Sequence, residues 1–195
     1  RFHLKSWGIL IQKYANGIED SAVSSDMRPP IKGIGNSCTS PFDIYSKDEA
    51  LKVLLSLCEM VGMRLRQAGF CAKLVSVTLR GTDLQYWSHQ CKTFMATDNT
   101  MKIYQIAGKL MDEMWSGKPL RGMGVRVSEL VPCDFLQISI FEGYNERKKK
   151  LDDTIDSLRM KYGLNAVFRS CFLGSNLPPV SGGVIEGYQM MTSIL

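Results

Sequence analysis

Between residues 31 and 132 the chain alternates segments with the two-residue period of a strand and segments with the 3.6-residue period of a helix. The order is strand, helix, strand, strand, helix, strand. The expected strands are Ile31–Thr39, residues 72–80, Gln85–Ala96 and Met123–Leu130. Each strand keeps one polar face, as Val75, Val77 and Leu79 alternate with Ser76, Thr78 and Arg80. This pattern predicts an α+β fold, βαββαβ, in which two helices cover one face of a four-stranded sheet and the other face stays open.

Both helices carry sequence signals at their ends. Ser46 and Glu49 form a capping box that opens the first helix, and Gly69 ends it. Its apolar stripe is Ala50, Leu54, Leu57, Val61 and Leu65. The second helix follows Asp98 and stops at Gly117 and Pro119. Its stripe is Ile103, Ala107, Leu110 and Met114.

The flanking segments have a different character. Leu4, Trp7, Ile11 and Tyr14 are spaced for one face of a short helical segment, and Ser24–Pro30 reads as an extended linker because proline restricts its own φ and its predecessor. After Pro132 come a short apolar piece, a charged helix and a glycine-rich tail. The helix carries Leu151, Ile155, Leu158 and Tyr162 on one side, whereas its Asp152 and Asp153 are typical of a solvated face. We therefore expect three regions, residues 1–30, 31–132 and 133–195.

Composition narrows the function classes. The net charge of +5 and the sequence pI of about 8.9 suit a polyanionic partner, although many proteins without one share them. Six cysteines stand singly with no C-x-x-C pair, and His3 and His89 lie far apart, so we expect reduced thiols and no metal site. No apolar run approaches the roughly 20 residues that span a bilayer. A cytoplasmic protein with no membrane partner, represented by a fragment that begins at Arg1, is the expectation.

The polar face of the expected sheet is rich in cations and hydroxyls and almost lacks carboxylates. Its residues are Lys32, Ser37, Thr39, Ser76, Thr78, Arg80, Gln90, Lys92, Arg126 and Ser128. Such groups suit contacts with phosphate oxygens, which are charge-assisted and indifferent to base identity. A solvated sheet face has the same pattern, and the pattern alone does not separate the two. Phe94 shares its alternation with Gln90 and Lys92, which a β-bulge would resolve.

Several runs, in this order, resemble the Y-family of bacterial translesion DNA polymerases. The first strand and helix of their little finger domain are similar to the run that begins at Ile31, IKGIGNSCTSPFDIYSKDEALKVLLSLCEMVGMRLR. Its second helix and closing strand are similar to KTFMATDNTMKIYQIAGKLMDEMW and RGMGVRVSELV. WGILIQKYANGIEDSAV resembles the end of the thumb, and KKKLDDTIDSLRMKYGLNAVFRSCFL the tail. The resemblance covers nearly the whole chain.

The resemblance implies that the open face lies along the major groove of primer-template DNA, held by Lys32, Ser37, Thr39, Gln90, Lys92 and Arg126. Many members carry arginine in place of Gln90, which implies a weaker grip in the third strand. The palm carboxylates that bind the catalytic Mg²⁺ ions in the family are missing here. We therefore expect a non-catalytic module with no cofactor and no small-molecule substrate of its own, Mg²⁺ belonging to the parent polymerase.

Gln137-Ile138-Ser139-Ile140-Phe141 resembles the peptide by which bacterial polymerases dock on the sliding clamp. The glutamine amide suits a small polar pocket, and Ile140 and Phe141 suit an apolar cleft. Pro132 and Cys133 with Asp134 are expected to interrupt the ladder before this peptide. The alternative is a fifth short strand or a hydrophobic strap across the core.

The function expected is therefore that of a DNA-gripping region of a translesion polymerase in DNA damage repair. The alternative is a protein-interaction module of a repair protein that touches DNA only incidentally. An RNA-binding ferredoxin-like domain is disfavoured, because the exposed sheet shows no pair of stacking aromatics.

Overall fold

A computed structural model describes residues 5–19, 31–133 and 146–180. The chain divides into two compact units, residues 1–30 and 31–195. In the first unit, helix α1 spans Lys5–Ala15. After it, the side-chain amide of Asn16 donates to the carbonyl of Gln12 at 2.8 Å, and Gly17 takes a φ of 71°. This is the short N-terminal helical segment that the sequence predicts.

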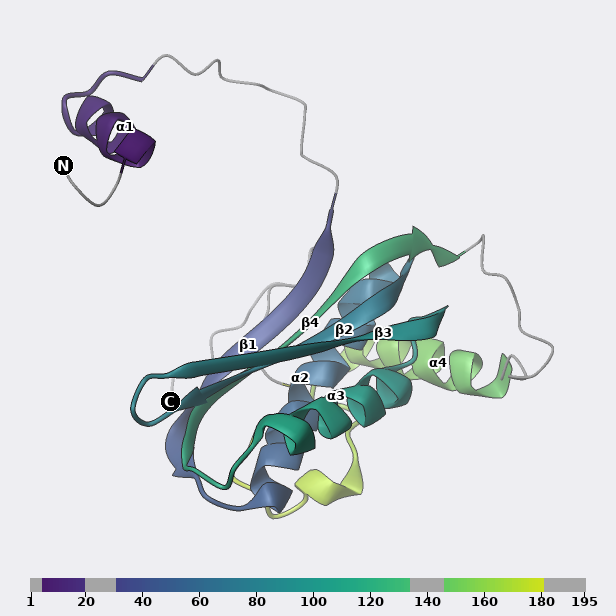
Figure 1. Ribbon diagram of the computed structural model, residues 1–195. Helices are drawn as coiled ribbons and strands as arrows, with labels where there is room; N and C mark the ends of the chain where they lie inside the picture. Colours follow the sequence, from purple (N-terminus) through teal and green to yellow (C-terminus); the bar gives the residue numbers. More distant parts are fainter. Residues whose placement is uncertain (1–4, 20–30, 134–145, 181–195) are drawn as a thin grey trace. The chain divides into compact units, whose positions relative to one another are not determined.

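The second unit is built on one antiparallel sheet of four long strands (Figure 1). The strands are β1 (Gly33–Ile44), β2 (Phe70–Gly81), β3 (Tyr86–Thr97) and β4 (Leu120–Pro132). Their order across the sheet is β1-β4-β2-β3, so β4 and β2 are central and β1 and β3 are edges. The predicted four-stranded fold is confirmed, with β1 and β4 longer than their alternation indicated.

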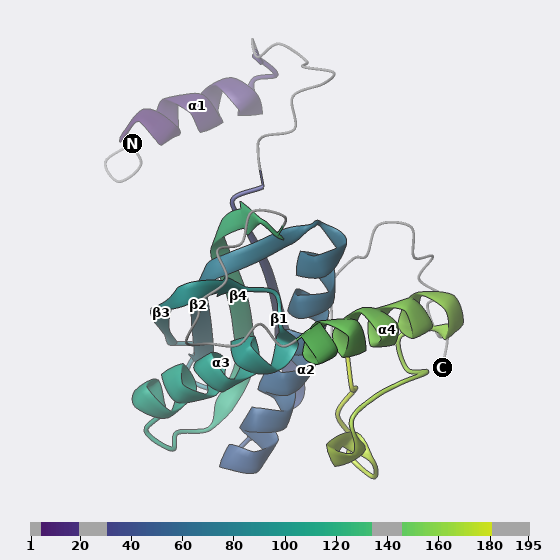
Figure 2. The ribbon, with the colours of Figure 1, turned by 90° about the vertical axis from the view of Figure 1, so that its right-hand side faces the viewer.

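Helices α2 (Lys47–Gln67) and α3 (Thr100–Met114) lie on the same side of the sheet (Figure 2). The backbone N–H of Glu49 donates to the Ser46 hydroxyl at 3.2 Å, as the capping box predicts. Gly69, with a φ of 71°, follows the end of α2. At α3 the cap is Asn99, whose side-chain oxygen accepts from the N–H of Lys102 at 3.0 Å. These side chains satisfy backbone donors that a helix leaves unpaired in its first turn.

The hydrophobic core lies between the sheet and the two helices. From the sheet it takes alternate residues of the central strands, Val75, Val77, Leu79, Val125 and Val127. From the helices it takes the stripes predicted from periodicity, including Leu54, Leu57, Val61, Ile103 and Ala107. Since these side chains are removed from water, each valine, leucine and isoleucine among them contributes on the order of 1.5 to 3 kcal/mol. Every second residue of β2 and β4 is thereby fixed toward the core, and the residues between them face outward.

A bulge interrupts β3 where the sequence pattern was ambiguous. Lys92 pairs with Leu74 and Thr97 pairs with Ala72, so the residues between them form an irregular stretch. The Thr93 hydroxyl closes it by donating to the carbonyls of Lys73 and Met95. Phe94 projects from the bulge and is 90% exposed. The predicted bulge is confirmed.

Helix α4 (Glu146–Tyr162) and the short 3-10 helix η2 (Ser170–Phe172) follow, and α4 meets α2 at a steep angle (Figure 2). The apolar residues expected on one side of α4 do not form its buried face, because Leu151 is 58% exposed and Tyr162 is 64% exposed. Three of its charged residues, Asp152, Asp156 and Arg159, are buried instead, with Asp152 at 7% and Arg159 at 2% exposure. The expectation of a solvated Asp152 is therefore wrong.

Ion pairs explain why the charged side of α4, and not its apolar side, is buried. Arg66 of α2 donates to both carboxylate oxygens of Asp156, at 2.6 and 3.0 Å, and lies 3.6 Å from Asp152. Burial by itself lowers the pKa of Arg66, but the hydrogen bond and charge of Asp156 outweigh it, so the net pKa is raised. Burial raises the pKa of Asp152 despite the nearby Arg66 charge. Asp156 is thus the main anionic partner of Arg66.

A second pairing fixes the segment after α4. Glu59 of α2 accepts from Arg159 at 2.7 Å and from Arg169 at 2.6 Å. The hydroxyl of Ser56 donates to the carbonyl of Pro178 at 2.7 Å, and Leu177 reaches the main core. The region after residue 145 therefore packs on the domain as far as it is described.

Two features at the end of β4 differ from expectation. Pro132 pairs with Phe70 inside the ladder, and the N–H of Cys133 still donates to the carbonyl of Gly69 at 3.0 Å, so the ladder runs through the proline. This is possible because the missing proline donor falls at the last position of the strand. Cys71 and Cys133 form a disulfide, which corrects the expectation that all cysteines are reduced. Among the described residues, no helix is long and apolar enough to cross a membrane.

Candidate nucleic-acid interface

The sheet face opposite α2 and α3 presents a regular grid of side chains, because the registers of the three strand pairs align outward-facing residues in rows. In the order β1, β4, β2, β3, successive rows are Gly33, Ser128, Leu74 and Lys92; then Gly35, Arg126, Ser76 and Gln90; then Ser37, Gly124, Thr78 and Ser88; then Thr39, Gly122, Arg80 and Tyr86. The grid holds all the predicted DNA-binding residues except Lys32. Lys32 precedes β1, and its alternation groups it with buried Ile34.

A groove runs along the β1 and β4 side of this face, and four of its lining residues are glycines. Gly33 and Gly35 on β1 pair with Ser128 and Arg126, whereas Gly124 and Gly122 on β4 pair with Ser37 and Thr39, so one side chain is missing from each of these four pairs. The groove has a volume of about 790 Å³. A Cβ atom at Gly33 would lie 2.8 Å from the carbonyl oxygen of Val127, and one at Gly122 would lie 3.1 Å from that of Cys38. A side chain at Gly33 or Gly122 would therefore crowd the neighbouring strand, which accounts for glycine at these positions.

Cationic side chains border the groove from three elements. Arg126 of β4 lies over the glycines of β1, with its Nε 3.1 Å from the position of a Gly33 Cβ. Arg80 of β2 lies over the ring of Tyr86, 5.3 Å from the centroid. Arg64 comes from α2 and donates to the carbonyl of Gly35 at 3.0 Å. Three guanidinium groups thus line one open groove, an arrangement that suits a chain of phosphates.

Two of the predicted residues have partners of their own. Lys92 forms an ion pair with Glu129 at 2.7 Å, so part of its charge is already neutralised. Glu129 adopts a φ of 52° near the end of β4. The Ser76 hydroxyl donates to the backbone carbonyl of Arg126 at 3.1 Å, which commits its hydrogen atom. Lys92 and Ser76 are therefore weaker candidates than Arg126 and Arg80.

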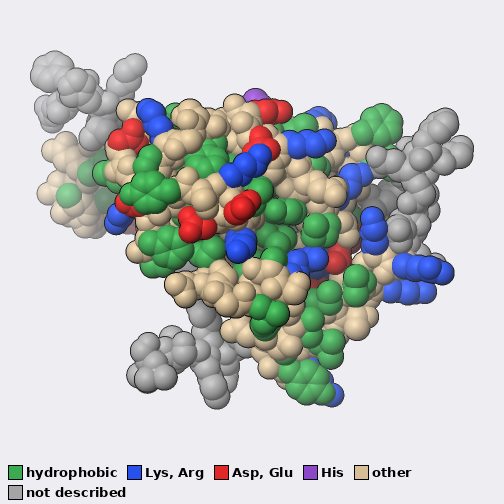
Figure 3. Space-filling model, turned by 90° about the horizontal axis from the view of Figure 1, so that it is seen from below, with side chains coloured by type: hydrophobic (Ala, Val, Ile, Leu, Met, Phe, Trp, Pro, Cys, Tyr) green, Lys and Arg blue, Asp and Glu red, His purple; other side chains and the backbone are tan. Residues whose placement is uncertain are grey.

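The helix side of the domain has a different surface. Seen from below in Figure 3, acidic, basic and apolar side chains are interspersed there. The described ion pairs on that side include Lys47 with Asp112 and His89 with Glu113. The groove residues, in contrast, include no carboxylate.

Some groove residues were missed by sequence reasoning. Arg64 belongs to a helix, and its role depends on the packing of α2 against β1, which strand alternation cannot show. Tyr86 lay inside an expected strand, and its pairing with Arg80 needed the register. The glycines had a signal, since two of them stood in the first strand, but the two on β4 are distant from them in sequence. Gln137–Phe141, the predicted clamp peptide, lies outside the described residues.

The comparison with known families decides the assignment. Residues 31–140 match the impB/mucB/samB family C-terminal domain. The chain belongs to this family, the Y-family DNA polymerases. It includes their little finger domain, as the sequence motifs indicated.

Individual relatives agree with this assignment. DNA polymerase IV of Clostridium acetobutylicum is 40% identical over 170 residues, which cover 87% of this chain and 43% of the relative. DNA polymerase IV 2 of Bacillus subtilis is 35% identical over 176 residues, covering 87% and 42%. The chain thus spans less than half the length of these relatives. Among solved structures, a chain of a complex of a β-clamp processivity factor and the little finger domain of PolIV is similar to this one. The match covers 56% of this chain and 99% of the solved chain, at 21% identity and a TM-score of 0.45.

Proposed function

We propose that the little finger domain of this chain grips the phosphate backbone of primer-template DNA on its open sheet face, as part of a translesion polymerase in DNA damage repair. The observation that carries the proposal is the glycine-floored groove bordered by Arg64, Arg80 and Arg126. Nucleotide transfer with Mg²⁺ would belong to the polymerase as a whole. The domain itself positions DNA.

The chemistry of the groove favours backbone contact over base reading. Guanidinium groups and the hydroxyls of Ser37, Thr39 and Thr78 donate to phosphate oxygens regardless of sequence. Because Gly122 and Gly124 carry no side chains, a phosphate chain can lie close to β4 there, beside the guanidinium group of Arg126, which itself lies on Gly33 and Gly35. Affinity should come from charge, with weak preference for any base sequence.

Titration against DNA tests the proposal. The chain is titrated with two unrelated duplexes of equal length at several salt concentrations. We expect similar affinities for both duplexes and a steep fall with salt, because binding releases counterions. A protein-interaction module that touches DNA incidentally predicts weak DNA affinity, and a strong preference for one duplex would also contradict the proposal.

We further propose that Gln137–Phe141 docks the domain on a bacterial sliding clamp. The support is the peptide itself, a glutamine followed at three and four residues by Ile140 and Phe141, only a few residues after β4 ends at Pro132. Each apolar side chain can contribute on the order of 1.5 to 3 kcal/mol when it is buried in a pocket. DNA and clamp would then contact different parts of the chain, so both could bind at once.

A further inference from the structure

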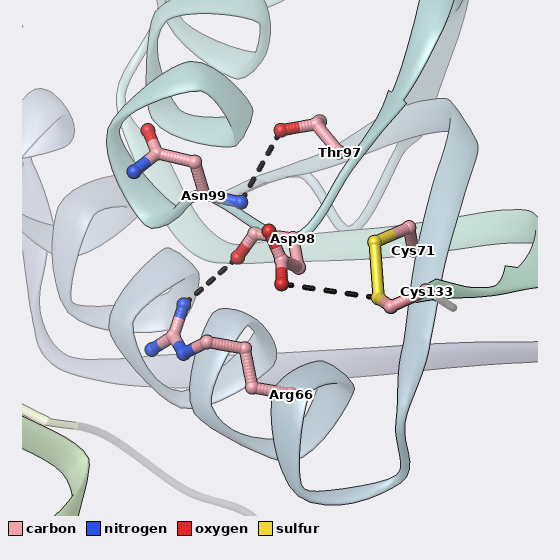
Figure 4. Close-up of a disulfide and its surroundings, with 6 residues drawn as sticks. All are labelled: Arg66, Cys71, Thr97, Asp98, Asn99 and Cys133. Atoms are coloured by element: carbon pink, nitrogen blue, oxygen red, sulfur yellow. Dashed lines mark hydrogen bonds between the residues drawn. A yellow bond between two sulfur atoms is a disulfide. The ribbon is translucent and has the colours of Figure 1, made fainter. Parts of the chain in front are cut away.

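Cys71 and Cys133 join the two central strands at one end of the sheet. Cys71 is the second residue of β2, and Cys133 directly follows β4 (Figure 4). Their Cα atoms are 5.3 Å apart, within the range that a disulfide bridges without backbone movement. The ladder sets this distance, because Cys71 pairs with Val131 and the N–H of Cys133 donates to the carbonyl of Gly69. The backbone ladder therefore keeps the two Cα atoms within bridging distance whether or not the sulfur atoms are joined.

A carboxylate lies beside this pair. Oδ2 of Asp98 is 3.8 Å from Sγ of Cys133 (Figure 4). Asp98 is held in place, because its backbone carbonyl accepts from Arg66 at 2.8 Å. A disulfide sulfur carries no hydrogen, so Cys133 can donate to Asp98 only as a thiol. The contact therefore favours the dithiol over the disulfide.

We propose that Cys71 and Cys133 form a reversible thiol–disulfide switch, oxidised by low-molecular-weight disulfides and held toward its reduced state by Asp98. Cys133 is the more accessible of the two, since Cys71 is fully buried. The thiolate of Cys133 attacks the small disulfide and releases one small thiolate, leaving a mixed disulfide. Cys71 then loses its proton and attacks the Cys133 sulfur, which releases the second. One small disulfide is reduced to two thiols while two protein thiols are oxidised to one bridge.

The switch changes how firmly the end of β4 is fixed. In the reduced state, backbone pairing, including the hydrogen bond from Cys133 to Gly69, holds Pro132 and Cys133 to the start of β2. In the oxidised state, a covalent bond between residues 62 apart in sequence adds to them. The bridge restricts the unfolded chain, so the oxidised domain is more stable. It also fixes the point at which the chain leaves the sheet.

Glutathione redox buffers test the proposal on the full 195-residue chain. The reduced protein is equilibrated at several ratios of oxidised to reduced glutathione, alkylated and mapped by mass spectrometry. We expect a bridge between Cys71 and Cys133, a higher melting temperature after oxidation, and full reversal by excess thiol. The exposed Cys91 and Cys171 should give only glutathione adducts, so Cys91→Ser serves as the matched control and leaves the bridge unchanged.

The variant Asp98→Asn tests the role of the carboxylate. Loss of its charge weakens the bond from the Cys133 thiol, so we expect several-fold more bridge at the same glutathione ratio. If the bridged fraction of Asp98→Asn equals that of wild type at the same glutathione ratio, the role of Asp98 is overturned. Separate glutathione adducts on Cys71 and Cys133 in place of a bridge overturn the switch. So does tight binding of one Zn²⁺ by the reduced protein that blocks bridging, since Cys71, Cys133 and Asp98 place their ligand atoms within 4.8 Å of one another.

Discussion

The side chain of Arg126 packs against the backbone of Gly35 on the neighbouring strand, where a Cβ atom would lie 3.2 Å from Cβ and 3.3 Å from Cγ of the arginine. The cation reaches over β1 because this position carries no side chain. The position of Arg126 on the proposed DNA-binding face therefore depends on the absence of a side chain at Gly35.

Gly35→Ala tests this relationship. The added methyl group should push Arg126 off the floor of the groove and weaken DNA binding by roughly 0.5 to 1 kcal/mol, about two- to fivefold. Titration by fluorescence anisotropy measures it. The matched control is Gly108→Ala on α3, where a new Cβ would meet only Leu51 at 3.6 Å and DNA affinity should stay unchanged. Equal effects of both substitutions would contradict the assignment.

Glu129→Gln should strengthen DNA binding. The carboxylate pairs with Lys92 at 2.7 Å and adds negative charge beside the groove face, so its removal frees Lys92 for phosphate. We expect a gain of about 0.5 kcal/mol at low salt that fades as salt rises. Lys92→Ala should cost less than Arg126→Ala for the same reason. A loss of affinity in Glu129→Gln would show that the pair orients Lys92.

The buried pairs beneath α4 predict opposite outcomes for two neighbouring carboxylates. Asp156→Asn breaks the two-bond contact with Arg66 and leaves that cation buried, so we expect a loss of about 3 kcal/mol in the free energy of unfolding. Asp152→Asn keeps an acceptor for Asn99, which donates to it at 2.7 Å, and should change stability by about 1 kcal/mol or less at neutral pH. Urea denaturation of both variants measures the difference.

The pH dependence of Asp152→Asn follows from the raised pKa of Asp152. A carboxyl with a raised folded-state pKa favours the folded protein below its unfolded-state pKa, and this contribution is lost as the pH rises through the folded-state value. Asparagine does not ionise, so the variant does not lose this contribution to stability as the pH rises. Relative to wild type, it should therefore gain stability as the pH rises from below the ordinary value of 3.8 to above the raised one. A relative gain on acidification would contradict the assignment.

Periodicity predicted the sheet and the two helices that cover it, because burial on one face imposes a repeat that the residues of α2 and α3 display. It failed at α4, where Leu151 and Tyr162 indicated the wrong face. The buried side is chosen there by Arg66 and Glu59, which lie in α2, about 90 to 110 residues from their partners. The local sequence pattern of α4 cannot show pairs between residues so far apart in the chain. The polar face of the sheet could be predicted, whereas Arg64 and the disulfide depend on tertiary packing.

The proposed clamp peptide gives a separate prediction. Phe141→Ala with Ile140→Ala should abolish binding to a bacterial sliding clamp, while DNA affinity stays unchanged, because the two apolar anchors are lost. Surface plasmon resonance on an immobilised clamp measures it. If the segment were a strap across the core, the double variant would instead lose several kcal/mol of stability. Melting temperature on the same variant separates the two.

The salt dependence of DNA affinity in two arginine variants of β4 tests the central claim most directly. Arg126 faces the groove, whereas Arg121 is an exposed cation of the same strand that lies 4.0 Å from Asp43 and outside the groove. Arg126→Ala should weaken binding to unrelated duplexes equally and lower the slope of log affinity against log salt by about one unit. Arg121→Ala should leave the slope near that of wild type. An unchanged slope in Arg126→Ala, or an equal drop in both variants, would contradict a DNA-binding role for the open face.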